Sequence, residues 1–284
     1  MEPTSKINTL FIVGPTASGK SALSIELAKN LGAEIICADS QTLRRGMDIG
    51  TAKPTPKERQ MIVHHMLDCI DPYEDYNLSM FLRDSRKILQ DIHARGKRAI
   101  VVGGTGLYTD ALYFNFELPD ISANHIEGMT VEELRDHILK IGLAVPKNSS
   151  NPRHLINTIK RNGKVGVKGK PIAGSLIIGI NPGREMLIDR INARVDAMFE
   201  NGFIDEVKAV LSEYGEPPDD FDAIGYRIAY RYIKNEIDID EAKALFKIAD
   251  RQYAKRQMSW YKRNEDIVWF SSPEDAKSFI LKRA

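Results

Sequence analysis

Residues 10–21, LFIVGPTASGKS, contain the pattern GxxxxGKS directly after four apolar residues. An apolar run that ends at a glycine is typical of a buried strand in a parallel sheet. The residues that follow, 18–31, have helical periodicity through Leu23, Leu27 and Ala28. We therefore expect a strand, a loop and a helix in that order, which is the context in which this pattern forms a phosphate-binding loop (P-loop).

The residue types of this loop suit a diphosphate or a triphosphate. Glycines allow successive backbone N–H groups to face phosphate oxygens, and the helix start adds the positive end of its dipole. Lys20 can neutralise phosphate charge, and the Ser21 hydroxyl is suited to hold Mg²⁺. The residues predicted to surround the phosphates are Gly14, Pro15, Thr16, Ala17, Ser18, Gly19, Lys20 and Ser21.

Further apolar runs alternate with helical stretches along the first half of the chain. The run EIICAD ends at Asp39, a helix is expected over 78–95, and the run RAIVVGGTG begins at Arg98. Strands that alternate with helices indicate a parallel sheet. The sequence therefore predicts an α/β fold with a doubly wound parallel sheet of the P-loop NTPase-like kind.

The pattern of apolar strands alternating with helices stops in the middle of the chain. We expect a catalytic core over 1–118 and 173–284, with a helical C-terminal part that ends in a short strand at 267–270. Residues 119–172 are predicted to form a small insertion domain, with helices over 130–141 and 152–162.

Two polar residues follow the predicted strands beside the loop. Asp39 ends its strand, so its carboxylate should emerge at the same edge of the sheet as the phosphate site. It is a candidate base for an acceptor substrate, and the alternative is that it caps the turn through Ser40 and Gln41. Thr105, in the turn GGTG, is a candidate second donor to the same phosphates.

The composition excludes several classes of protein. Over 284 residues, 40 Lys and Arg balance 39 Asp and Glu, so the chain is neither a globally basic nucleic-acid binder nor an acidic solvating chain. Two cysteines are too few for a disulfide framework or a four-thiolate zinc site. Adjacent side chains do not converge on one ion, so packing or a hydrogen bond is favoured for His64 and His65. No run of about 18 apolar residues occurs, and we expect a cytoplasmic protein that does not span a membrane.

Positive charge is nevertheless concentrated in two places. No Asp or Glu occurs between His137 and Arg184, and this stretch is rich in Lys and Arg. On the helix expected around 242–261, basic residues fall roughly on one face with aromatic residues interleaved, and a solvated helix surface is the other explanation. These basic residues are Lys247, Arg251, Lys255 and Lys262.

Several motifs together resemble those of the tRNA dimethylallyltransferases, also called tRNA isopentenyltransferases. In the first half these are GPTASGKSALSIELA, ADSQTLRRGMDIGTAKP, HHMLDCIDP and VVGGTGLY. In the second half they are INPGREMLIDRINARVDAMFENGFIDEV, IGYR and RQYAKRQMSWYKR. The likeness covers about 8–118 and 175–270, and the block with RGMDIGTAK is more specific than the P-loop.

The resemblance implies transfer of the dimethylallyl group of dimethylallyl diphosphate to N6 of adenosine 37, beside the anticodon of a tRNA. In that family the P-loop holds the diphosphate of the prenyl donor. By motif position, Lys20 and Ser21 would bind diphosphate and Mg²⁺. Thr105 would stabilise the departing diphosphate, and Arg184 would bind it from the other side.

On the acceptor side, the resemblance implies that Asp39 hydrogen-bonds or deprotonates the attacking amine. The residues that would contact the anticodon stem-loop are Asp39, Ser40, Gln41 and Thr42, with Arg251, Lys255 and Arg256 of the basic C-terminal helix. An exocyclic amine is a poor nucleophile, and a base in a structured loop must be turned out, so a placed carboxylate and basic, aromatic surfaces suit this chemistry.

The insertion departs from the family pattern. It looks shorter than usual, and NPRHLINTIK places His154, Asn157 and Lys160 where Arg, Arg and Glu would stand. This change bears on how tRNA is gripped and how the diphosphate side is closed.

Three other functions are compatible with parts of the sequence. A P-loop small-molecule kinase would place ATP in the loop and use Asp39 to activate a hydroxyl. A prenyltransferase could instead accept AMP, ADP or ATP, and an RNA-binding module could have lost turnover. Nothing in the patterning demands a dimer, and we expect a monomer.

Overall fold

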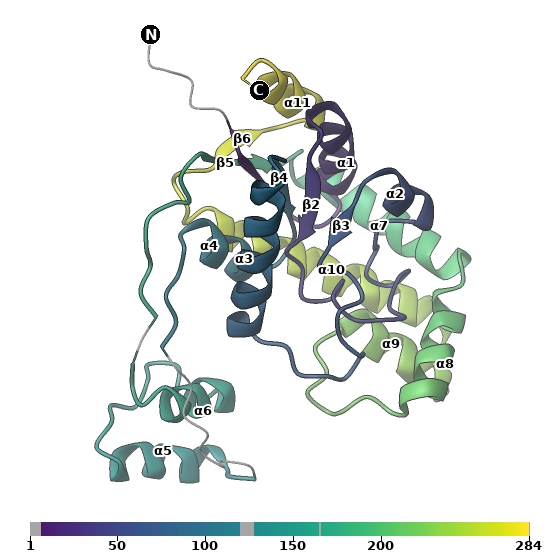
Figure 1. The fold of residues 1–284 in the computed structure, drawn as a ribbon. Helices are drawn as coiled ribbons and strands as arrows, with labels where there is room; N and C mark the ends of the chain where they lie inside the picture. The colour runs from purple at the N-terminus through teal and green to yellow at the C-terminus, as the bar shows by residue number, and fades with distance from the viewer. Residues whose placement is uncertain (1–6, 120–127, 165, 284) are drawn as a thin grey trace. The chain divides into compact units, whose positions relative to one another are not determined.

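The computed structural model describes residues 7–119, 128–164 and 166–283 (Figure 1). Two compact units divide the chain. The core unit comprises the described residues up to Tyr113 and from Ile172 onward, and the inserted unit comprises Phe114–Pro171. The insertion thus begins at Phe114 rather than at 119. Residues 1–6 and 120–127 of the predicted core and insertion lie outside the described residues.

The described residues of the core unit form one parallel sheet in the order β3-β2-β4-β1-β5-β6. The strands are β1 (Thr9–Val13), β2 (Glu34–Cys37), β3 (His64–His65), β4 (Ala99–Val102), β5 (Ser175–Ile180) and β6 (Val268–Phe270). β1 is the switch point of this sheet, because β2, β3 and β4 lie on one side of it and β5 and β6 on the other. Loops at such a switch point form binding crevices in parallel sheets. The predicted α/β fold is confirmed.

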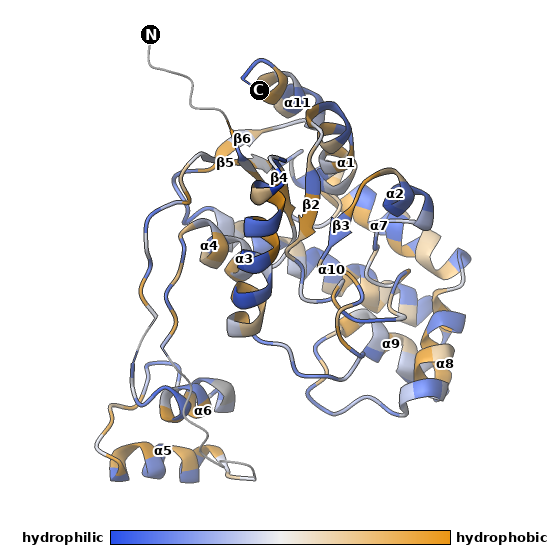
Figure 2. Ribbon diagram, viewed as in Figure 1, coloured by the Kyte–Doolittle hydropathy of each residue, from blue (hydrophilic) through white to orange (hydrophobic). Residues whose placement is uncertain are grey.

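Helices cover both faces of this sheet because side chains alternate along each strand. On β1, Phe11 packs edge-on against Tyr113, with ring centroids 5.2 Å apart. Leu10, on the other face, lies with Leu31 and Ile280. The first face is covered by α3 (Leu78–Ala94) and α4 (Gly106–Tyr113), and the second by α1 (Lys20–Leu31) and α11 (Pro273–Leu281). The strands are largely coloured as hydrophobic, whereas α2 (Pro56–Met61), which stays partly exposed along its length, is hydrophilic (Figure 2).

A second group of helices lies beyond the carboxyl ends of the strands (Figure 1). It comprises α7 (Arg184–Glu200), α8 (Phe203–Tyr214), α9 (Ile224–Ile233) and α10 (Ile239–Tyr261). The buried Phe203 lies at the centre of their apolar core, with its ring 5.1 Å from that of Tyr226 and 5.6 Å from that of Phe246. Met47, from the loop after β2, is buried in the same cluster. This loop is therefore packed between the sheet and the helices.

The inserted unit has its own small core. Leu134 and Ile138 of α5 (Val131–Lys140) pack against Leu155 and Ile159 of α6 (Pro152–Lys160). Both helices were predicted, because this four-residue spacing places each pair of apolar side chains on one face. Of the residues that depart from the family pattern, His154 and Asn157 are exposed on α6.

Candidate active site

The P-loop has the backbone geometry that its glycines predict. Gly14 has φ +148°, and a Cβ added there would lie 2.5 Å from the carbonyl oxygen of Ile180. Gly19 has φ +92° and precedes α1, whose first turn has no side-chain cap. The N–H groups of this first turn are thus available to an anion.

The loop borders a cavity of about 280 Å³, which we call the loop cavity. Its lining includes all residues from Thr16 to Ser21 together with Asp39, Thr42 and Arg194. The Ser18 hydroxyl is fully buried and makes no hydrogen bond within the described part of the chain. A buried polar group without a partner is costly, and this hydroxyl belongs to the residues that line the loop cavity.

Lys20 borders the loop cavity with its charge poorly compensated. Its ammonium donates a hydrogen bond to the carbonyl oxygen of Pro15 at 3.2 Å. Burial lowers the pKa of Lys20 to about 8, while the Asp39 carboxylate acts in the opposite direction and the Arg194 guanidinium adds to the fall. An anionic ligand would stabilise the charged form of Lys20, which burial disfavours.

A second cavity of about 390 Å³, the helix cavity, adjoins the first. Both cavities are lined by Thr16, Asp39, Thr51, Gly104 and Arg194. The rest of the helix cavity mixes apolar and polar residues. Its apolar lining includes Leu107, Met198, Ile224, Phe246 and Trp260, and its polar lining includes Asp222, Asp250, Tyr253 and Arg256. The site therefore has an anion-binding side and a partly apolar side that meet at Asp39 and Arg194.

Asp39 and Thr105 lie at this meeting point, as their positions after β2 and β4 predict. One carboxylate oxygen of Asp39 accepts a hydrogen bond from the N–H of Gln41 at 3.0 Å, so the turn-capping role is present. The other oxygen lies against Gly104, where an added Cβ would come within 2.8 Å of it. The Thr105 hydroxyl oxygen accepts a hydrogen bond from the N–H of Ser40 at 3.0 Å. Both side chains are thus held on the lining of the site.

Helix α10 ties the two phosphate-side loops together. The buried Gln257 accepts a hydrogen bond from the N–H of Thr16 at 2.7 Å and donates one to the carbonyl oxygen of Gly104 at 2.8 Å. Tyr261, one turn further along the same face, donates to the carbonyl oxygen of Gly103 at 3.2 Å. No role for Gln257 was predicted from the sequence, although the residue lies within the motif RQYAKRQMSWYKR.

The basic residues predicted on α10 fall into two groups, one bonded to α7 and one exposed. Lys247 forms an ion pair with Asp196 at 2.6 Å, and Arg251 donates to Asn192 of α7 at 3.2 Å. These two cations thus hold α7 to α10. Lys255 and Arg256 are exposed, and Arg256 also lines the helix cavity.

Arg184, the arginine expected at the diphosphate, lines neither the loop cavity nor the helix cavity. Arg184 is the exposed first residue of α7, whereas Arg194 lies almost three turns further along, about 15 Å by the rise of an α-helix. Of the described arginines on α7, Arg194 lines both cavities, and Arg190 donates to the carbonyl oxygen of Ser18 at 3.5 Å. Helix α7 carries arginines at 184, 190 and 194, and only tertiary packing separates them.

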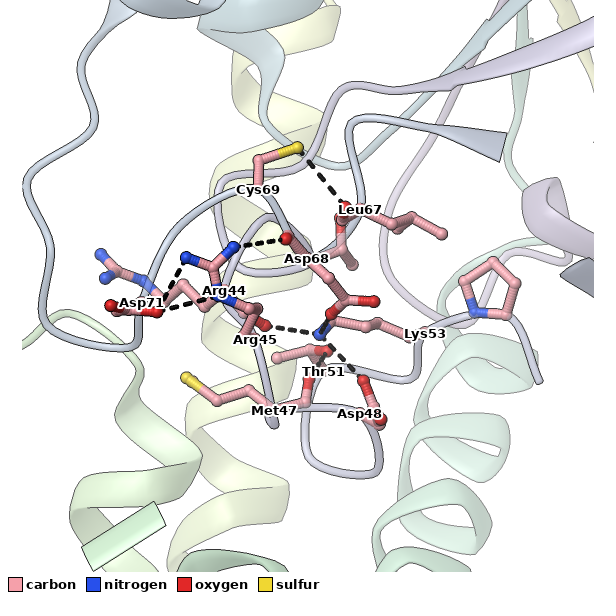
Figure 3. Close-up of polar contacts among 12 residues, drawn as sticks. Arg44, Arg45, Met47, Asp48, Thr51, Lys53, Leu67, Asp68, Cys69 and Asp71 are labelled. Atoms are coloured by element: carbon pink, nitrogen blue, oxygen red, sulfur yellow. Dashed lines mark hydrogen bonds and ion pairs between the residues drawn. The ribbon is translucent and has the colours of Figure 1, made fainter. Parts of the chain in front are cut away.

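The block RGMDIGTAK forms a loop that a buried lysine organises (Figure 3). The side chain of Lys53 has no exposed surface and pairs with Asp48 at 2.9 Å and with Asp68 at 2.5 Å. From the helical side, the Glu206 carboxylate accepts the N–H groups of residues 48–50 at 2.7 to 3.0 Å. These contacts fix Thr51, which lines both cavities.

The residues around the loop cavity fit a Mg²⁺ ion held largely by phosphate. Ser21 is exposed and lines this cavity with Asp39. Mg²⁺ usually takes one or two protein oxygens together with substrate phosphates. The described residues contain no group of three or more His, Cys, Asp or Glu able to hold a metal.

The histidine pair forms the edge strand β3, which the sequence did not predict. His65 hydrogen-bonds Glu34 at 2.8 Å, and His64 hydrogen-bonds the carbonyl oxygen of Ile62 at 2.8 Å. The hydrogen-bonding interpretation of this pair is confirmed. None of the helices in the described ranges is both long enough and apolar enough to cross a membrane.

Comparisons with known proteins agree with these features. A model of the IPP transferase family matches residues 43–264, and a model of isopentenyl transferases matches residues 7–69. A tRNA dimethylallyltransferase of Carboxydothermus hydrogenoformans is 36% identical over 96% of this chain and 95% of its own length.

Solved structures give the same result. The tRNA isopentenylpyrophosphate transferase of Bacillus halodurans is 34% identical, with a TM-score of 0.75 and coverage of 98% of this chain and 97% of that one. A eukaryotic dimethylallyltransferase, at 23% identity and a TM-score of 0.79, shares the fold over 97% of this chain and 80% of its own. Because the family model spans most of the chain and near full-length relatives exceed 30% identity, this chain belongs to the IPP transferase family, the family of the tRNA dimethylallyltransferases.

Proposed function

We propose that this enzyme transfers the dimethylallyl group of dimethylallyl diphosphate to N6 of adenosine 37 in tRNA and releases diphosphate. Relatives that match nearly the whole chain carry the name tRNA dimethylallyltransferase. The observation that carries the proposal is the junction of the two cavities, where an anion site opens onto a partly apolar space beside a carboxylate.

The donor diphosphate fits the loop cavity. Lys20, the unpartnered Ser18 hydroxyl and the N–H groups at the start of α1 supply positive charge and donors to its oxygens. Arg194 borders the same cavity from α7. As the bond between C1 of the dimethylallyl group and its oxygen breaks, the electron pair leaves with the diphosphate, and these groups stabilise that charge.

The acceptor adenine fits the helix cavity, with its amine beside Asp39. The N6 lone pair forms the new bond to C1, and the amine proton passes to the Asp39 carboxylate. Gln41 holds one oxygen of Asp39 through its N–H at 3.0 Å, and this contact orients the carboxylate. The apolar lining beside it, including Leu107 and Trp260, suits an uncharged prenyl group.

A bound Mg²⁺ would neutralise part of the diphosphate charge, and Ser21 is the residue that would hold it. The tRNA backbone would lie on the exposed cations Lys255 and Arg256, of which Arg256 lines the helix cavity. The inserted unit, whose sequence from 138 to 171 lacks Asp and Glu, is the second tRNA-contacting surface of the proposal.

The alternatives explain less of the site. A small-molecule kinase needs the loop cavity and Asp39 but leaves the apolar side chains of the second cavity, such as Leu107 and Trp260, without a role. A transferase that accepts free adenylates has no use for the exposed cations of α10 or for a basic inserted unit.

The test follows label from the dimethylallyl group, with Mg²⁺, into unmodified tRNA that carries A36-A37-A38. A tRNA with G37 and free AMP, ADP and ATP are the matched acceptors. We expect incorporation into the first tRNA alone, recovered as N6-dimethylallyladenosine. Label in free nucleotide, consumption of ATP with a small acceptor, or tRNA binding without transfer by folded protein would each contradict the proposal.

A further inference from the structure

An ion pair between α7 and α10 lies at the junction of the two cavities. Nη2 of Arg194 contacts Oδ2 of Asp250 at 2.5 Å. The side chains are 26% and 15% exposed, so the pair is largely shielded from water. Arg194 lines both cavities, whereas Asp250 lines the helix cavity.

The guanidinium of Arg194 has donors left for another partner. A guanidinium carries five N–H donors in a fixed plane, and the carboxylate of Asp250 engages one end of it. The Nε atom is buried and has no hydrogen-bond partner among the described residues. Arg194 also lowers the pKa of Lys20, which places two cations close enough to interact at the loop cavity.

We infer that Asp250 is a positioning residue, which holds Arg194 at the junction so that its remaining donors pair with the diphosphate. This inference rests on the proposed function, because it assigns the donor diphosphate to the loop cavity. A long arginine side chain has many rotamers, and fixing it before the ligand arrives lowers the cost of binding and of charge stabilisation.

The neighbouring contacts show that the pair is not needed merely to join the helices. The same two helices are held by Lys247 with Asp196 and by Arg251 with Asn192. Neither Lys247 nor Asp196 lines the loop cavity or the helix cavity. Asp196 therefore provides a matched control for Asp250: the same residue type, in an ion pair between the same helices.

The experiment compares Asp250→Asn and Asp250→Ala with Asp196→Asn and Asp196→Ala. It measures kcat and KM for dimethylallyl diphosphate and for tRNA, and the affinity for inorganic diphosphate with Mg²⁺ by calorimetry. For Asp250→Ala we expect a fall of about tenfold to a hundredfold in kcat/KM for the donor and a weaker affinity for inorganic diphosphate, with KM for tRNA unchanged. The kcat/KM of Asp250→Asn should lie between those of Asp250→Ala and the unchanged enzyme, because an amide oxygen still accepts one N–H. The Asp196 variants should match the unchanged enzyme.

A double-mutant cycle adds a second readout. If Asp250 acts through Arg194, Asp250→Ala should have no further effect in the Arg194→Ala background. Additive losses would overturn the inference. Equal losses in the Asp196 and Asp250 variants would also overturn it, and so would a raised KM for tRNA with unchanged diphosphate affinity. Binding of inorganic diphosphate does not require the acceptor. The calorimetric measurement therefore still tests the role of Asp250 if the proposed acceptor is wrong.

Discussion

Replacing Lys20 by Met should stabilise the ligand-free protein while abolishing its binding of diphosphate. Burial lowers the pKa of Lys20 from 10.5 to about 8, and each tenfold change in a protonation equilibrium is worth about 1.4 kcal/mol. The charged lysine therefore costs the folded state about 3 kcal/mol at pH 7. Met loses the hydrogen bond to Pro15, worth about 1 kcal/mol, so we expect a net gain of about 2 kcal/mol.

The change of the free energy of unfolding with pH tests the sign of the Lys20 contribution independently. Between pH 8 and 10.5 the unfolded chain keeps the Lys20 proton and the folded chain has lost it, so stability rises with pH over this range. Below pH 8 both states are protonated and this contribution is constant. The Lys20→Met protein lacks the rise, so the two stabilities should converge as the pH approaches 10.5.

The assay is urea unfolding from pH 7 to 10, with and without diphosphate and Mg²⁺. Lys29→Met, at an exposed position in the last turn of the same helix, is the control and should change stability by less than about 0.5 kcal/mol. Ligand should stabilise the unchanged protein and the control but not Lys20→Met. A Lys20→Met protein that is less stable at pH 7, or that tracks the unchanged protein at every pH, would refute the reasoning.

Three further substitutions test the rest of the site. Arg194→Ala should lower kcat/KM for the donor by about a hundredfold while Arg184→Ala changes it less than threefold, as steady-state kinetics would show; the reverse order would restore the assignment made from sequence. Lys53→Met should lower the free energy of unfolding by about 1 to 2 kcal/mol in urea, because it removes the buried hydrogen bonds of Lys53 while Arg59 still pairs with Asp48 and Asp68, and an unchanged midpoint would contradict this. Gln257→Leu leaves the N–H of Thr16 and the carbonyl of Gly104 unpaired, so calorimetry should show a loss of about 2 kcal/mol and kinetics a raised donor KM.

The parts of the fold that local pattern dictates could be predicted from the sequence. β1, the P-loop and α1 follow from an apolar run, two glycines and helical periodicity, and the helices of the inserted unit follow from their spaced apolar residues. β3 was missed because two histidines carry no strand pattern, and its pairing with β2 is a tertiary contact. α4 was missed because it begins inside the turn GGTG and five of its eight residues are buried, so no polar face marks it as a helix.

The candidate site shows the same division. Asp39 and Thr105 could be placed because parallel strands end at one edge of a sheet. Arg194 and Gln257 could not, because they come from helices whose distance to the loop depends on packing around Phe203. Lys247 shows the converse, since a cation on a predicted basic stripe proved to be neutralised by Asp196 across a helix interface.

The most direct test of the account is the single-turnover rate of dimethylallyl transfer to tRNA by Asp39→Ala, measured alongside its affinity for inorganic diphosphate. Asp39 borders both cavities and is the proposed base. The account predicts a rate at least about a hundredfold below that of the unchanged enzyme, with diphosphate affinity changed by no more than a few fold. A near-normal rate of transfer would remove Asp39 from the mechanism and contradict the account.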